Sequence, residues 1–511
     1  MFKKIRNLGD SRYLVARNTS VLALSQIALR VVYIFYIAAL ARHVGSEGIG
    51  MISTATALNG LLVVFFAPGL RTLFVRDVAA NPEKADTYLS NMLAIRIFLM
   101  VPFVLLSLLF AYGGAYGEDQ ILIIHMYTVV FITDTITEIL LCVFRAWERM
   151  ELEAGTEVLM QVANIVISLI GISLGWSLFA IVGVSIFSHS LRLVVTFFIV
   201  HRNYAKITFK VNFNESRTLF IVSMSFGVLW IIHTFQDQMG TFVLSQYYNA
   251  ETVGIYSPAK LVISTLLMIP SAFSMAIMPA FSRLNTLDKR TLRKFYQLSY
   301  KYLMVLGFPL GVGTMIVGGT LITQIYGEEF SGSTPIIQVM AIFLFTIVGY
   351  SNGTFMNVTG QQGFYAKTQA LATIFNVTLL FFIVPTYGPV GSAIAFTASG
   401  LTTFYIHSRA CHNYLDIQIP WLLMGRVLFV AGLMGAALIF SIDLGLNWVI
   451  ASIVVAPVTY GACLIFFRIV NMEELKILAG DTGRVSKEKV EAEEANSNED
   501  IANDTPAPVT R

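Results

Sequence analysis

Two pairs of titratable residues, each spaced four positions apart, lie inside long apolar stretches. Asp134 and Glu138 form one pair, and His233 and Asp237 form the other. On a helix, this spacing places both members of a pair on one face. Neighbouring carboxylates repel unless a cation neutralises them or one takes a proton, and a histidine beside an aspartate can relay a proton near neutral pH. The four residues are therefore candidates for coupling or for lining a polar cavity.

The first pair also has a structural interpretation, in which a cation on a neighbouring helix ties the helices together. Arg30 and Arg96 are the candidate cations. Because Arg96 lies near the expected cytoplasmic end of its stretch, its long side chain is expected to reach water, as are those of Lys301 and Arg426. The sequence leaves both interpretations of the acidic pair open.

Three cations inside apolar stretches are candidates for a different role: Arg30, some ten residues into the first predicted span, Arg192, about two turns from the inner end of the sixth, and Lys260, one turn into the eighth from outside. A charge at the bilayer centre costs about 3 kcal/mol or more on insertion scales, so such a residue needs a compensating role. A cation in a polar cavity can hold an anionic group by charge-assisted hydrogen bonds. We expect these three residues to bind the substrate.

Membrane-spanning helices must position these side chains. The 511 residues are 56% hydrophobic and 13% charged, with a mean hydropathy of +0.70. This composition provides too few polar residues to cover the surface of a water-soluble globule. A helix needs about 20 residues to cross the hydrocarbon, and this rule predicts about fourteen spans. They lie near residues 20–41, 50–70, 91–112, 121–143, 156–174, 179–200, 218–246, 256–281, 298–324, 334–357, 368–384, 390–408, 424–441 and 448–467. The predicted fold class is an all-α polytopic membrane protein.

The Lys and Arg residues between these spans fall almost entirely in alternate loops. The opposite loops hold only Arg42. Because positively charged loops stay in the cytoplasm, both termini are predicted to be cytoplasmic. The net charge of +3 hides this asymmetry and indicates no partner by itself. No nucleic-acid partner is expected.

One segment of the chain repeats. Aligning residues 44–58 with residues 248–262 superposes Glu47 on Glu251, Gly50 on Gly254, Ser53 on Ser257 and Ala55 on Ala259. Each segment joins the first two spans of a predicted six-helix bundle. Since six is even, both bundles would insert in the same orientation, as in parallel-repeat transporters with a substrate site between the halves.

The expected domain organisation follows from the spans and the repeat. It comprises a cytoplasmic lead (1–19), a first six-helix bundle (20–200), a linker (201–217), a second six-helix bundle (218–408), two additional helices (424–467) and an acidic, disordered cytoplasmic tail (471–511). Pro270 is expected to interrupt the eighth span.

Several function classes are disfavoured. The cysteines Cys142, Cys411 and Cys463 show no CxxC spacing, so neither a disulfide framework nor a metal site is supported, and no cofactor is expected. Membrane glycan polymerases and ligases usually carry catalytic residues in a long external loop. Here no expected outside loop exceeds about a dozen residues on the span rule. We therefore expect a protein that is not an enzyme.

Four segments resemble a known family. They are LARHVGSEGIGMISTATAL (40–58), FRAWERMELEA (144–154), FQDQMGTFVLSQYYNAETVGIYSPAKLV (235–262) and PTYGPVGSAIAFTASG (385–400). The sequence resembles the polysaccharide transport or oligosaccharide flippase family, part of the multidrug/oligosaccharidyl-lipid/polysaccharide exporter superfamily. The resemblance covers roughly residues 15–470.

The resemblance implies two six-helix bundles that alternate between inward-open and outward-open states. It further implies translocation of a lipid-linked oligosaccharide across the cell membrane, with membrane lipids and glycan-assembly proteins as partners. Cavity cations on the first and eighth spans of similar proteins correspond here to Arg30 and Lys260, and a common acidic residue on the seventh span corresponds to Asp237. A cation-coupled multidrug exporter is the alternative, and a glycan polymerase or ligase is disfavoured.

Overall fold

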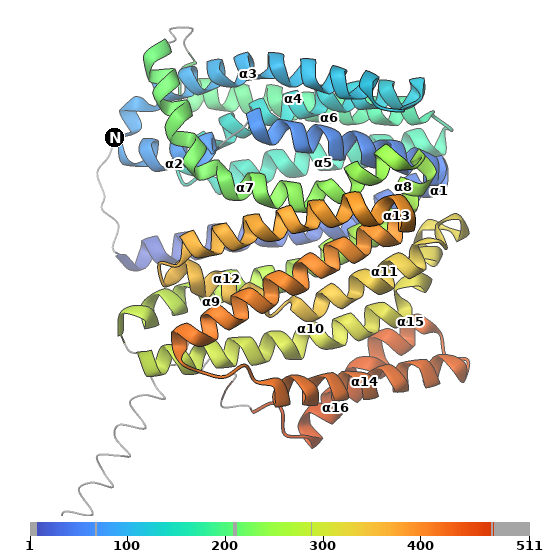
Figure 1. Cartoon of the computed structure of the whole chain (residues 1–511). Helices are drawn as coiled ribbons and strands as arrows, with labels where there is room; N and C mark the ends of the chain where they lie inside the picture. The colour runs from blue at the N-terminus through green and yellow to red at the C-terminus, as the bar shows by residue number, and fades with distance from the viewer. Residues whose placement is uncertain (1–7, 67–68, 208–211, 288, 472–473, 475–511) are drawn as a thin grey trace, which may run out of the picture. The chain divides into compact units, whose positions relative to one another are not determined.

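The computed structural model describes residues 8–66, 69–207, 212–287, 289–471 and 474, with side chains described from residue 32 onward except at 213, 214, 225, 226 and 287. These residues are almost entirely helical, and no strand occurs among them (Figure 1). By length and composition, ten of the described helices could cross a membrane, or up to twelve if each of two bent pairs is one span. The predicted helical, multi-pass class is confirmed.

The main helices run in chain order with short connections. They are α1 Leu8–Phe66, α2 Leu70–Ala80, α3 Ala85–Gly113, α4 Glu118–Ala146, α5 Met150–Ser173, α6 Leu178–Asn203, α7 Phe213–Tyr247, α8 Ala250–Leu266, α9 Met268–Leu287, α10 Lys289–Tyr326, α11 Ser333–Ala341, α12 Gly349–Val358, α13 Gln362–Leu415, α14 Trp421–Asp443, α15 Trp448–Ile450 and α16 Ala456–Phe466. Short 3₁₀ turns lie at Pro82–Lys84, Glu328–Phe330 and Ile342–Thr346.

Two very long helices contain a break at a glycine. Gly45 in α1 has φ of 70°, and Gly388 in α13 has φ of 54°. Glycine tolerates this left-handed region because it has no Cβ. Each break falls between two predicted spans, so each helix supplies the two predicted segments. The total of fourteen spans stays a prediction.

The eighth predicted span is interrupted as expected. Helix α8 ends at Leu266 and α9 begins at Met268, so the break lies just before Pro270. Proline has no backbone N–H to bond the carbonyl four residues earlier, and its ring clashes with that carbonyl, here of Leu266.

The chain forms two compact units. The first contains Met1–Thr265, Gly318–Met340 and Gln369–Ser399, and the second contains Leu266–Val317, Ala341–Thr368 and Gly400–Arg511. In the first unit, α4 packs against α1, α3 and α6, and α6 also packs against α5 (Figure 1). In the second unit, α9 packs against α12 and α14 packs against α16. The predicted bundles 20–200 and 218–408 stay a prediction, and the predicted acidic tail lies mostly outside the described residues.

The two repeated segments contact each other inside the first unit. A Cβ added at Gly50 of α1 would lie 1.7 Å from the carbonyl oxygen of Ala250, and one added at Gly254 of α8 would lie 1.8 Å from that of Ser46. The hydroxyl of Ser257 donates to that of Ser53 at 2.7 Å. Equivalent residues of the repeat therefore face each other across a close helix crossing that only glycine permits.

A charged side chain caps a helix end near this crossing. Glu329 accepts hydrogen bonds from the Ser46 hydroxyl at 2.5 Å and the Ser46 N–H at 2.8 Å, so it caps the helical segment that follows the Gly45 break. These bonds hold the pKa of the Glu329 carboxyl below its ordinary value. The contact is thus present at neutral pH and is lost as the pH falls through the lowered pKa.

Arg42, the single cation predicted in the outer loops, caps the C-terminal end of a helix. Its Nε donates to the Ile325 carbonyl at 2.9 Å and its Nη2 to the Gln324 carbonyl at 2.5 Å, in the last turn of α10. A cation is favourable there because the final carbonyls lack intrahelical partners and carry the negative end of the helix dipole.

The glycine crossing gives a direct stability test. Gly50→Ala and Gly254→Ala are each expected to lower the free energy of unfolding by about 1–3 kcal/mol or more, because overpacking forces the backbones apart. Gly183→Ala in α6 is the matched control, since a Cβ there meets no atom within 4 Å. Thermal unfolding of the purified protein measures the difference. Unchanged stability in both crossing variants would contradict the close approach.

Candidate functional site

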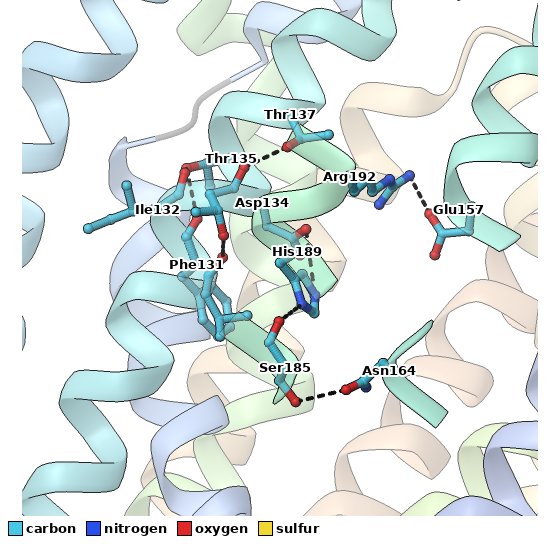
Figure 2. Close-up of polar contacts among 12 residues, drawn as sticks. Phe131, Ile132, Asp134, Thr135, Thr137, Glu157, Asn164, Ser185, His189 and Arg192 are labelled. Carbon is cyan, nitrogen blue, oxygen red and sulfur yellow. Dashed lines mark hydrogen bonds and ion pairs between the residues drawn. The ribbon is translucent and has the colours of Figure 1, made fainter. Parts of the chain in front are cut away.

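A histidine on α6 faces one of the predicted acidic residues on α4. The Nε2 atom of His189 lies 3.7 Å from Oδ1 of Asp134 (Figure 2). The His189 side chain is 15% exposed and that of Asp134 is 43% exposed. Asp134 falls near the middle of the 29-residue helix α4, so its partner lies at a similar depth. This contact is an ion pair only when the imidazole is protonated.

The other ring nitrogen of His189 is fixed by its own helix. Nδ1 lies 2.8 Å from the carbonyl oxygen of Ser185, which can only accept, so Nδ1 carries the hydrogen. The Ser185 hydroxyl in turn donates to Oδ1 of Asn164 on α5 at 3.3 Å. A polar line therefore runs from Asp134 through His189 and Ser185 to Asn164, joining α4, α6 and α5 (Figure 2).

Arg192, a predicted substrate-binding cation, is instead seen in an ion pair with Glu157 of α5 (Figure 2). Its side chain is only 9% exposed, whereas that of Glu157 is 38% exposed. Arg192 follows His189 by three residues, so both side chains lie on one face of α6. The arrangement neutralises Arg192 within the protein.

Glu138 faces a cation on α3. Arg96 interacts electrostatically with Glu138 and donates from Nη1 to the Phe66 carbonyl at 3.2 Å. The expectation that Arg96 reaches water is wrong, because the residue is only 2% exposed. The sequence places it about three turns into α3, and the neighbouring helices cover it. Arg96 is thus the helix-tying cation of the structural interpretation.

These contacts belong to one set of charges in the first compact unit. At the end of α4, Arg145 binds Glu153 of α5 through two hydrogen bonds of 2.7 and 2.5 Å. Three acids lie within ion-pair distance of a basic group, namely Asp134 with His189, Glu153 with Arg145 and Glu157 with Arg192, and Glu138 interacts with Arg96 at longer range. We call these eight residues the α4–α6 charge network. Arginine stays charged in proteins, so His189 is the basic member of the network whose charge depends on a bound proton.

Lys260 and Asp237 form a second polar group, between α8 and α7. The Lys260 ammonium lies 3.5 Å from Oδ2 of Asp237, 3.4 Å from Oε1 of Gln238 and 3.5 Å from the Thr241 hydroxyl. These distances are long for hydrogen bonds, so the ammonium is held loosely. The Asp237 side chain is 53% exposed and that of Lys260 is 22% exposed. A competing anion could therefore reach this pair.

The remaining predicted residues are placed differently. His233 lies one turn before Asp237 on α7, yet the carboxylate of Asp237 faces Lys260, and among the described residues no hydrogen bond joins it to His233. Arg30 lies on α1, but its side chain is outside those described. Sequence reasoning missed His189 and Glu157. The signal for His189 was its three-residue spacing from Arg192 within one apolar stretch.

Over the part of the chain that the structure describes, no group of three or more His, Cys, Asp or Glu side chains is placed to hold a metal ion. The chemistry of the groups described above is that of ion pairs and hydrogen bonds.

Comparison with known proteins identifies relatives over most of the chain. A family model described as polysaccharide biosynthesis protein matches residues 15–285. A protein of Haloferax volcanii named as a low-salt glycan biosynthesis flippase is 20% identical, over 76% of this chain and 84% of its own. A Shigella flexneri protein named as an O-antigen transporter is 23% identical, over 73% of this chain and 93% of its own.

Solved structures share the fold. The lipid II flippase MurJ, in an inward closed conformation, matches with a TM-score of 0.68 at 15% identity, over 88% of this chain and 98% of its own. A multidrug resistance transporter of the MATE family, in an inward-facing conformation, matches with a TM-score of 0.57 at 16% identity, over 77% of this chain and 95% of its own. At these identities, the likeness shows the fold alone.

The pair of Arg192 and Glu157 can be tested by removing one or both charges. Glu157→Leu is expected to lower the free energy of unfolding by about 3 kcal/mol, because it leaves a buried guanidinium without a counter-charge. The double variant with Arg192→Leu should recover most of that loss, since no unpaired charge then remains. Thermal unfolding of the purified variants measures both.

Arg149 and Glu151 provide a matched control, because both side chains of that ion pair are 49% exposed. Arg149→Leu should change stability little, as is usual for exposed pairs. A double variant no more stable than Glu157→Leu alone would show that Arg192 and Glu157 do not depend on each other.

Proposed function

The chain belongs to the polysaccharide biosynthesis protein family, and on this premise we propose that it is a flippase for a lipid-linked oligosaccharide. The substrate would be carried on a polyprenyl phosphate or pyrophosphate and would move from the cytoplasmic to the outer face of the plasma membrane. The names of the relatives from Haloferax volcanii and Shigella flexneri support this proposal. The relatives are named as flippase and transporter, which is consistent with a protein that is not an enzyme.

The physical difficulty of this reaction lies in the head of the substrate. A phosphorylated sugar head loses its hydration in hydrocarbon, whereas the lipid tail can stay in the bilayer. Alternating access between two bundles, with about fourteen spans and both termini in the cytoplasm, would move the head alone through a polar path. The two states need differ by only a few kcal/mol for a ligand to shift their populations.

The observation that carries the substrate assignment is the loose ion pair of Lys260 and Asp237. A phosphate that displaced Asp237 would gain a charge-assisted bond from an ammonium that now sits 3.4–3.5 Å from three acceptors. Arg30, the other cation that the family resemblance implies, would act with Lys260. We assign Arg192 to the α4–α6 charge network rather than to the phosphate, because Glu157 already neutralises it.

The proposal is tested in cells that lack this gene. Lipid-linked oligosaccharide is expected to accumulate on the cytoplasmic face and surface glycan to be lost, because no protein moves the anionic head across. Susceptibility of the precursor to a membrane-impermeant reagent, in intact cells and in inverted vesicles, measures its sidedness. Normal glycan with impaired efflux of a cationic dye would contradict the flippase and favour the multidrug exporter.

Lys260 is tested by returning variants to those cells. Lys260→Gln is expected to slow the appearance of precursor on the outer face at least tenfold, since one charge-assisted bond is worth about 1.5–3 kcal/mol, and Lys260→Arg should keep part of the rate. Lys206→Gln, in the exposed loop after α6, is the control for loss of a positive charge. At matched protein levels, a wild-type rate in Lys260→Gln would remove Lys260 from the substrate site.

A further inference from the structure

We propose that His189 and Asp134 form a proton-binding site, and that proton binding there switches the ion pair between α6 and α4 on and off. The inference rests on the proposed function only for its consequence, which is that a proton gradient drives or times the flipping step. The ligand is a proton, and the atom that takes it is Nε2 of His189.

The geometry fixes where the proton goes. Because Nδ1 donates to the Ser185 carbonyl at 2.8 Å, a neutral ring has its lone pair on Nε2. That lone pair would face the Asp134 carboxylate at 3.7 Å, so two acceptors would oppose each other. Protonation of Nε2 replaces this repulsion with an attraction between opposite charges, while Nδ1 keeps its hydrogen bond to Ser185.

The charged groups around His189 come from its own helix and from the two helices packed against it. Helix α6 packs against α4 and α5. Helix α4 places Asp134 opposite His189, and Glu138 lies one turn after Asp134. On α6 itself, Arg192 lies three residues after His189. Helix α5 contributes Glu157, which binds Arg192, and Glu153, which binds Arg145. Glu153 and Glu157 are paired with arginines and Glu138 interacts with Arg96 at longer range. Because arginine does not release its proton, His189 is the basic group beside Asp134 that can gain or lose one.

The site is also open to proton exchange. The Asp134 side chain is 43% exposed although it lies near the middle of α4, whereas the His189 side chain behind it is 15% exposed. Carboxylates at such depth in membrane proteins almost always face the bundle interior or a water-filled cavity. From such a cavity a proton would reach the imidazole over the exposed carboxylate, and an ordinary histidine changes its charge in the range of pH 5 to 8.

Proton binding would act on helix packing. With the proton bound, α4 and α6 are joined by an ion pair, and the Ser185 and Asn164 contacts extend that link to α5. With the proton released, Asp134 lacks a counter-charge and the α4–α6 contact weakens. One titration thus biases two arrangements of the same three helices, which is the requirement for a coupling ion.

The first arm of the test measures proton binding without transport. The full-length protein, labelled with ¹⁵N-histidine in lipid nanodiscs, is followed by solid-state NMR between pH 5 and 8.5, and His189→Gln identifies the signal. We expect the Nε2 signal of His189 to change from protonated to unprotonated across this range, and Asp134→Asn to weaken proton binding about tenfold, because it removes the opposite charge. A signal that does not change with pH, or one that Asp134→Asn leaves unaltered, overturns the proposal.

The second arm measures flipping of lipid-linked oligosaccharide in liposomes, with and without an imposed pH gradient. The gradient should accelerate the wild type and the control His125→Gln, but should change His189→Gln less than twofold. Equal acceleration of His189→Gln overturns the coupling role. If the wild type moves no oligosaccharide while the first arm succeeds, the proposed function fails and the proton site stands.

Discussion

Charge pairing in a poorly polar environment is the constraint on which the rest of this structure depends. Within helices α4 to α6, Asp134, Glu153 and Glu157 each lie within ion-pair distance of a basic group on a neighbouring helix, and Glu138 interacts with the buried Arg96 of α3 at longer range. An unpaired charge at such a position costs several kcal/mol, so the pairs set which faces of these helices can meet. Two of the ion pairs use arginine, which keeps its charge. The third uses His189 and is an ion pair only when the imidazole is protonated.

The internal repeat gives the first unit its second constraint. Equivalent glycines, Gly50 and Gly254, bring α1 and α8 together so closely that no side chain fits between them. The repeat is not symmetric in chemistry, however. Six residues after Gly254 stands Lys260, whereas the equivalent position in the first copy is Thr56. The shared backbone geometry thus positions a cation that only one copy carries, beside the Asp237 of α7.

Much of the fold could be predicted from the sequence, because hydropathy and helix length decide which segments can cross a membrane. The same reasoning found Gly50 opposite Gly254 in the alignment and the break before Pro270. It could not show that the repeated segments touch each other, since an alignment carries no distances. It also misjudged Arg96, because distance from a helix end says nothing about whether neighbouring helices cover the side chain.

The candidate site was harder to predict, since pairing between helices is invisible in a linear sequence. Asp134 and Glu138 were found from their spacing, but their partners come from α6 and α3, which spacing on α4 cannot reveal. Asp237 was placed with His233, one turn away on the same helix, whereas its carboxylate faces Lys260 on the next helix. Residues on one helix face share a direction, and the tertiary packing decides what they meet.

The central claim, that this chain moves an anionic lipid-linked sugar head across a bilayer, is tested most directly with the purified full-length protein in liposomes. Lipid-linked oligosaccharide would be loaded in both leaflets, and its accessibility to a membrane-impermeant glycosidase would be followed over time. We predict that nearly all of the substrate becomes accessible with the protein present, while about half stays protected in protein-free liposomes. Continued protection of the inner half, in liposomes where the same protein transports a cationic dye, would contradict the account.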